Sequence, residues 1–102
     1  TAIQGKEMSF QNNVFQPGAI LHEVIVGAMR SRGSSLNEWC KNNGVAWTAV
    51  RQVTFGMSAG PRSHAMLDRL INDAGREVVT AAYRIRMDAE AQKLALNTRV
   101  AA

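Results

Sequence analysis

Apolar residues recur at intervals of three and four positions along most of the chain after residue 17, which is the spacing of one face of an α-helix. Glycine residues interrupt this pattern at positions 33, 44, 56, 60 and 75, and glycines at such places commonly mark helix ends. The pattern predicts helices over about residues 17–32, 36–43, 45–55, 63–74 and 76–96. We therefore expect an all-α fold, a compact five-helix bundle that ends in a long C-terminal helix.

The second predicted helix is short and is separated from the third only by a tight turn at Gly44. Its apolar positions fall on one face: Leu36, Trp39 and Cys40. The hydroxyl of Ser34 or Ser35 can cap its start, and Glu38 follows Ser35 at the spacing of a reciprocal capping box. Gly44 can adopt the left-handed backbone conformation that ends a helix without a side-chain clash. Two short helices joined by a tight turn are the expected result.

The third predicted helix, which starts near Val45, has one apolar face and one polar face. The apolar stripe consists of Val45, Ala49, Val50 and Val53. The opposite face carries Trp47, Thr48, Arg51 and Gln52, with Phe55 near its edge. We expect the first set to be buried and the second to meet solvent or a partner.

Residues 36–55 resemble the helix-turn-helix of the phage repressor and Cro-like superfamily, with Gly44 in the turn and valines along the second helix. The flanking residues 32–36 (RGSSL) and 60–62 (GPR) are similar to the small Ner-type regulators of transposable phages. The similarity covers roughly residues 17–86 and is at the level of pattern. Cys40 stands where the family usually has alanine. Asn43 stands where a buried aliphatic residue is common, so we expect a wetter turn there.

The resemblance implies a sequence-specific regulator of phage or prophage transcription that binds double-stranded DNA. From the residues themselves we expect a homodimer, and a place in the cytoplasm associated with the nucleoid. The net charge of +4, from 12 Lys and Arg against 8 Asp and Glu, suits a polyanionic partner. We expect the helix that starts near Val45 to read the major groove, with bases contacted by Thr48, Arg51, Gln52 and Trp47. Packing of Trp47 on Trp39 or on the first helix is the alternative for that side chain. Expected phosphate contacts are Arg62, Lys41, Arg30 and Arg32.

The predicted C-terminal helix has an apolar band wider than one packed face requires, so one face can serve the core and another a partner. We expect a homodimer interface that includes Val79, Tyr83 and Met87. Alternatively, alanine-rich sequence simply extends the helix by its intrinsic propensity. We divide the chain into an irregular arm over 1–16, a DNA-binding domain over 17–87 and an exposed or dimerising extension over 88–102.

The residue pattern contains no constellation that indicates an enzyme, a cofactor or a metal site. His22 and His64 stand apart, the single Cys40 has no partner for an internal disulfide, and no apolar run is long enough to span a membrane. Two other functions remain open beside the regulator. One is a DNA-binding or protein-binding adaptor, such as a packaging-terminase small subunit or a factor associated with RNA polymerase or another phage protein. The other is a scaffold that has lost DNA affinity.

Overall fold

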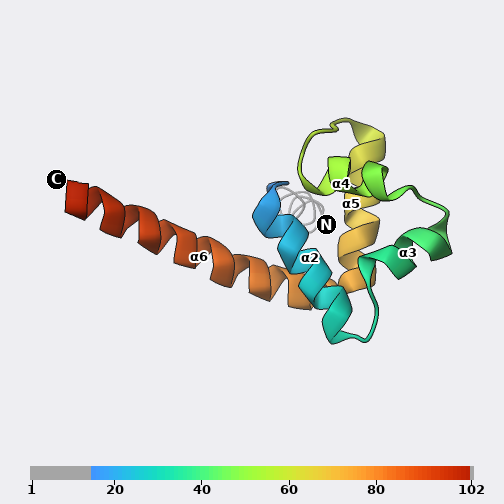
Figure 1. Ribbon diagram of the computed structural model, residues 1–102, viewed down its shortest axis with the longest axis horizontal. Coiled ribbons are helices and arrows are strands. Elements are labelled where there is room, and N and C mark those ends of the chain that lie inside the picture. The colour runs from blue at the N-terminus through green and yellow to red at the C-terminus, as the bar shows by residue number, and fades with distance from the viewer. Residues whose placement is uncertain (1–14, 102) are drawn as a thin grey trace, which may run out of the picture.

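Five helices make up the part of the chain that the computed structural model describes, residues 15–101, with side chains described for residues 15–96. They are α2 (Ala19–Ser31), α3 (Leu36–Asn43), α4 (Trp47–Thr54), α5 (Pro61–Ala74) and α6 (Arg76–Ala101). Figure 1 shows α2, α5 and the start of α6 packed together, with α3 and α4 beside them and the rest of α6 projecting away. Residues 15–101 contain no strand, and the predicted all-α five-helix bundle is confirmed.

The core is mostly aliphatic and is built from the apolar stripe of each helix. Its fully buried side chains include Leu21, Ile25, Val50, Leu70 and Val79. Phe15 joins this core from the segment before α2, where its ring lies edge-on to Tyr83 with centroids 5.3 Å apart. The backbone N–H of Gln16 donates to the Tyr83 hydroxyl over 3.0 Å. An aromatic side chain of the predicted arm therefore does pack on the core, whereas residues 1–14 lie outside the described residues.

The positions of Pro17 and Pro61 relative to the starts of α2 and α5 differ from the prediction. Pro17 was expected in the first turn of α2, but that helix begins at Ala19, because Gly18 is extended and its N–H donates to the carbonyl of Thr54 over 2.8 Å. Pro61 precedes the predicted start of the fourth helix at about residue 63 but is the first residue of α5, where its missing N–H costs no hydrogen bond. The backbone bond from Gly18 thus fixes the entry to α2 against the end of α4.

Hydrogen bonds and a cation–π contact between side chains link α3 to α5. The indole N–H of Trp39 donates to the Asp73 carboxylate over 2.7 Å, and Trp39 is otherwise buried. The Arg69 guanidinium lies 5.5 Å from the centre of the Trp39 ring and donates to the side-chain oxygen of Asn43. The amide group of Asn43 also donates to the Trp39 carbonyl over 2.8 Å. Asn43 is half-buried, and its side chain is bonded to protein atoms in the turn that was expected to be wetter.

Replacing Asp73 with alanine should lower the free energy of unfolding by about 1–3 kcal/mol, because the buried Trp39 N–H would lose its acceptor. Chemical denaturation measures this loss. Asp68→Ala is the matched control: Asp68 forms an ion pair with Arg76 in which both groups are partly exposed, so its loss should cost no more than about 1 kcal/mol. Equal destabilisation by the two variants would contradict the role given to Trp39 and Asp73.

The start of α6 packs on α2 and α5, and an ion pair of 2.9 Å between Arg86 and Glu23 ties it to α2. Val79 and Tyr83 were expected at a dimer interface, and this placement needs correction. They are 0% and 4% exposed because they lie one helical turn apart on the face that the chain's own core covers. Met87, one turn further, is 38% exposed. A second chain would therefore have to meet another face of α6.

Candidate nucleic-acid interface

The turn between α3 and α4 has the local structure that the sequence predicts. The hydroxyl of Ser35 accepts a hydrogen bond of 3.1 Å from the N–H of Glu38 and caps α3. Gly44 ends α3 in the left-handed conformation, with φ of 63° and ψ of 35°. The N–H of Val45 then donates to the carbonyl of Cys40 over 3.0 Å. These contacts fix the direction in which the chain enters α4 at Trp47.

The four predicted base-reading residues lie together on one exposed face of α4. Trp47, Thr48, Arg51 and Gln52 are all exposed, with Trp47 39% accessible. The opposite face of the same helix is formed by Val50, Val53 and Thr54, which are buried. The buried face of α4 packs on the bundle, so the polar face of this eight-residue helix is held pointing away from the core.

His22 of α2 contacts α4 at both of its ends. Its Nδ1 atom lies 2.9 Å from the Thr54 hydroxyl, and its ring centroid lies 4.6 Å from that of Phe55. The rings of His22 and Trp47 meet edge-on with centroids 6.2 Å apart, so Trp47 packs toward the first described helix and not on Trp39. The guanidinium of Arg51 lies 5.3 Å from the centre of the Phe55 ring. Sequence reasoning treated His22 as an isolated residue and missed this cluster, because the partners of His22 are more than 20 residues away in the chain.

The folded state favours neutral His22. Burial, and then the positive charge of Arg51, lower the pKa of His22 below its ordinary value of 6.5, while Glu23 acts in the opposite direction. The unfolded chain therefore binds a proton at a higher pH than the folded chain does. Stability from this source is present above pH 6.5 and is lost as the pH falls through the folded pKa.

We therefore expect the melting temperature to fall between about pH 7.5 and about pH 5.5, and to fall less in the His22→Gln variant. Thermal unfolding monitored by circular dichroism across this range makes the comparison. The same loss in both proteins would show that His22 does not carry the effect.

Two of the four basic residues expected at phosphates lie close to the ends of α4. Lys41 is exposed in the last turn of α3 and lines a shallow hollow together with Gly44, Val45 and Trp47. Arg62 is exposed in the first turn of α5, directly after the loop that leaves α4. Lys41 adjoins Trp47 in that hollow, and Arg62 follows α4 in the chain as an exposed basic side chain. We call Trp47, Thr48, Arg51 and Gln52, with Lys41 and Arg62, the α4 surface.

The other two basic residues lie elsewhere. Arg30 is exposed in the last turn of α2. The Arg32 guanidinium donates to the carbonyl of Asp73 over 2.6 Å and so helps to satisfy the C-terminal end of α5. Arg62 and Arg32 are thus at opposite ends of α5, on the order of 20 Å apart along a helix of 14 residues. The contact of Arg32 with the Asp73 carbonyl gives this side chain a structural role that requires no DNA.

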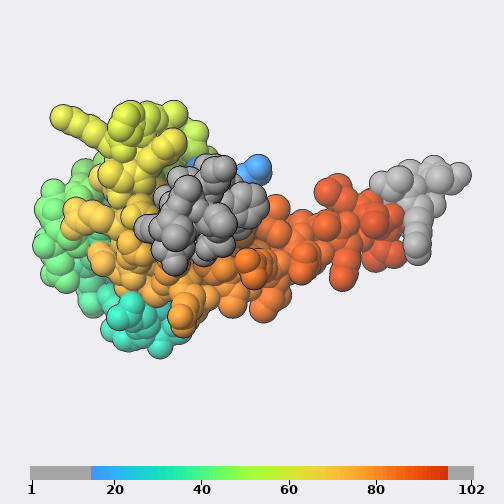
Figure 2. All heavy atoms as spheres, turned by 180° about the vertical axis from the view of Figure 1, so that it is seen from behind, coloured from blue at the N-terminus to red at the C-terminus, as the bar shows by residue number. Residues whose placement is uncertain are grey.

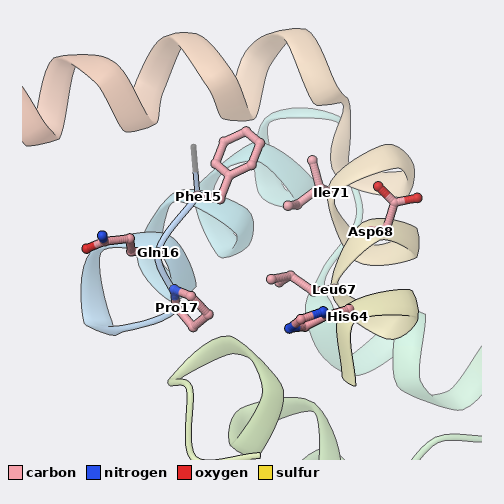
Figure 3. A pocket seen from close by; sticks show the side chains of 7 residues that line it. All are labelled: Phe15, Gln16, Pro17, His64, Leu67, Asp68 and Ile71. Carbon is pink, nitrogen blue, oxygen red and sulfur yellow. The ribbon is translucent and has the colours of Figure 1, made fainter. Parts of the chain in front are cut away.

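A hollow of about 250 Å³ lies between the segment before α2 and α5 (Figure 3). It is lined by Phe15, Gln16, Pro17, His64, Leu67, Asp68 and Ile71. In Figure 3 His64 and Leu67 point toward Pro17, whereas Asp68 points elsewhere, and its carboxylate pairs with Arg76. His64 and Asp68, one turn apart on α5, are therefore not arranged as an acid–base pair.

None of the protein families, curated proteins and solved structures compared with this chain matches it. Within the described part of the chain, no group of three or more His, Cys, Asp or Glu side chains could hold a metal ion. The described helices also include none that is long and apolar enough to cross a membrane.

Proposed function

We propose that this chain is a sequence-specific double-stranded DNA-binding transcriptional regulator of phage or prophage type, with α4 as the helix that enters the major groove. The observation that carries the proposal is the α4 surface, where Thr48, Arg51 and Gln52 share one exposed face of a helix whose other face is buried. An arginine can donate two hydrogen bonds to guanine, and a glutamine can pair with adenine. Threonine can contact a base or the methyl group of thymine.

Phosphate contacts would orient α4 on the duplex. Lys41 in the last turn of α3 and Arg62 in the first turn of α5 are both exposed, so each is available to a phosphate of the duplex. Ala46, which precedes α4, has no side-chain acceptor for the first N–H groups of the helix. Those N–H groups suit a phosphate oxygen, and the net charge of +4 favours approach to a polyanion.

The rigid attachment of the α4 surface also supports this proposal. Base reading requires side chains held in place before the duplex arrives, because ordering them on binding would reduce affinity. The bond from Trp39 to Asp73 fixes α3, and the contacts of His22 with Thr54 and Phe55 fix the end of α4. Trp47 packs against His22 with part of its ring exposed, so it can also contact a sugar or a base.

Selection of bound duplexes from a random-sequence pool by the full chain tests the proposal. We expect one short motif to be enriched, and the enriched duplex to bind more tightly than a shuffled duplex of the same composition. The difference should persist as salt rises, while binding to both weakens through counterion release. Failure of every duplex to bind at a low salt concentration of about 50 mM would overturn the proposal.

A second candidate function follows from the length of α6, a helix of 26 residues whose later part extends well beyond the bundle (Figure 1). Such a helix also suits an adaptor in a larger assembly, including a packaging-terminase small subunit or a factor that binds RNA polymerase. An oligomer of ring size in the absence of DNA would favour packaging. A footprint with two half-sites about one helical turn apart would favour the regulator.

A further inference from the structure

A mostly apolar stripe runs along α6 on a side that the bundle leaves largely exposed. Its members alternate at spacings of four and three residues: Val78, Ala82, Ile85, Ala89, Gln92 and Leu96. We call this stripe the α6 seam. Alternating steps of three and four residues form a heptad repeat, which is the pattern by which two helices wind around each other. The repeat continues for two and a half heptads with one polar position, Gln92.

The α6 seam is distinct from the side of α6 that serves the core. Val79 and Tyr83 face the bundle and are buried, whereas Val78, Ile85 and Leu96 are 49%, 69% and 58% exposed. Only Ala82, at the edge between the two sides, is half-buried. Figures 1 and 2 show the later part of α6 extending away from the other helices. Isoleucine and leucine exposed to this degree on one helix side are typical of an interaction surface.

We propose that the α6 seam binds the same seam of a second copy of this chain, with the two α6 helices parallel and in register. The charged residues beside the seam favour a second copy of the chain in this parallel arrangement. Asp88 and Lys93 flank it on opposite sides, five residues apart, which is the spacing that pairs across a parallel two-stranded coiled coil. Asp88 would therefore lie beside Lys93 of the partner subunit, and symmetry would form this pair twice.

An antiparallel pair would place like charges together. In that arrangement each side of the seam meets the same side of the other helix, so Lys93 would meet the basic side of the partner helix and would not reach Asp88 of the partner subunit. Arg86, on the same side as Lys93, is already paired with Glu23 of its own chain. In the single chain Lys93 contacts Glu90 of the same helix over 3.5 Å. This pair is exposed and weak, so Lys93 can exchange it for Asp88 of the partner subunit. In the parallel register Gln92 meets Gln92 of the partner subunit, and two amide groups can each donate and accept. Both features favour the parallel arrangement.

Sedimentation equilibrium of the full chain without DNA tests the pairing. We expect a monomer–dimer equilibrium, and Ile85→Asp should raise the dimer dissociation constant at least about tenfold, because it places two unpaired carboxylates in the seam. Leu94→Asp is the matched control, since Leu94 is 67% exposed on the same helix but lies outside the seam, and it should leave dimerisation unchanged. Monomer at every concentration, equal effects of the two variants, or an oligomer larger than a dimer would overturn the proposal.

Cysteine cross-linking tests the direction of the helices. In a Cys40→Ala background, Gln92→Cys should form a disulfide between chains on mild oxidation, because the two positions meet in a parallel register. Ala91→Cys, which lies one position away and outside the seam, should not cross-link. Equal cross-linking at both positions, or none at residue 92, would contradict the parallel pair. The inference depends on α6 alone, so its failure would leave the proposed DNA contacts of α4 standing.

Discussion

Replacing Arg51 with alanine should weaken binding to the preferred duplex about 5- to 150-fold, equivalent to about 1–3 kcal/mol, and relax the preference at one base position. Arg51 is exposed on α4, and its guanidinium lies 5.3 Å from the centre of the Phe55 ring, which restricts its orientation. Fluorescence anisotropy measures the effect, with the preferred duplex and a set of duplexes changed at single positions. Gln52→Ala should act similarly at a different base position.

Arg62→Ala provides the contrast with these two variants. Because Arg62 is assigned to a phosphate, its loss should weaken binding to all duplexes alike and reduce the slope of log K against log salt by about one unit. Circular dichroism and thermal unfolding establish that each variant is folded. If Arg51→Ala and Gln52→Ala also weakened all duplexes uniformly, these residues would not read bases and the role of α4 would have to be revised.

Replacing Gly44 with valine should lower the free energy of unfolding by about 1–3 kcal/mol, because a β-branched residue resists the left-handed conformation. Gly44 has φ of 63°, and a Cβ atom there would meet no other heavy atom within 4 Å. The expected cost therefore arises from the backbone and not from a steric clash. Chemical denaturation of the free protein measures it.

Gly44→Asn is the control for backbone strain, since asparagine tolerates the left-handed region better than other residues do. It should destabilise the protein clearly less than valine does. Because the turn sets the direction of α4, Gly44→Val should also weaken DNA binding where Gly44→Asn largely retains it. Equal stability of the valine and asparagine variants would mean that the turn adjusts its backbone without cost.

The elements around the α4 surface were predictable because their determinants are local. Ser35 and Gly44 mark the start and end of α3 by hydrogen-bonding and backbone properties that are visible in the sequence. The side chains of α4 separate into a buried and an exposed face as the helical period requires. Thr48, Arg51 and Gln52 are therefore exposed together, as expected. Their action on DNA stays a prediction.

The interactions that fasten these elements together were not predictable in the same way. The partners of His22 and Trp39 lie 32 and 34 residues away, so no local pattern indicates that His22 meets Thr54 or that Trp39 meets Asp73. Such contacts depend on how the helices pack, which the local periodicity of the sequence does not reveal.

The faces of α6 show a related difficulty. The sequence shows a band of apolar residues too wide for one packed face, but periodicity alone does not say which side of the band the core takes. The core takes Val79 and Tyr83, and the exposed side carries Val78 and Ile85. The exposed apolar side of α6 still offers a surface for a second chain. The residues on that side are not Val79 and Tyr83, which were expected there from the sequence.

The position of the duplex on the protein is the most direct test of the account. Backbone and indole N–H resonances of the full chain should be followed by nuclear magnetic resonance while the enriched duplex is added. We predict that shifts concentrate at residues 46–52, at the Trp47 indole and at Lys41 and Arg62, with little change along the α6 seam. Shifts centred on α6 or on the hollow near His64, with α4 unaffected, would contradict the claim that α4 meets DNA.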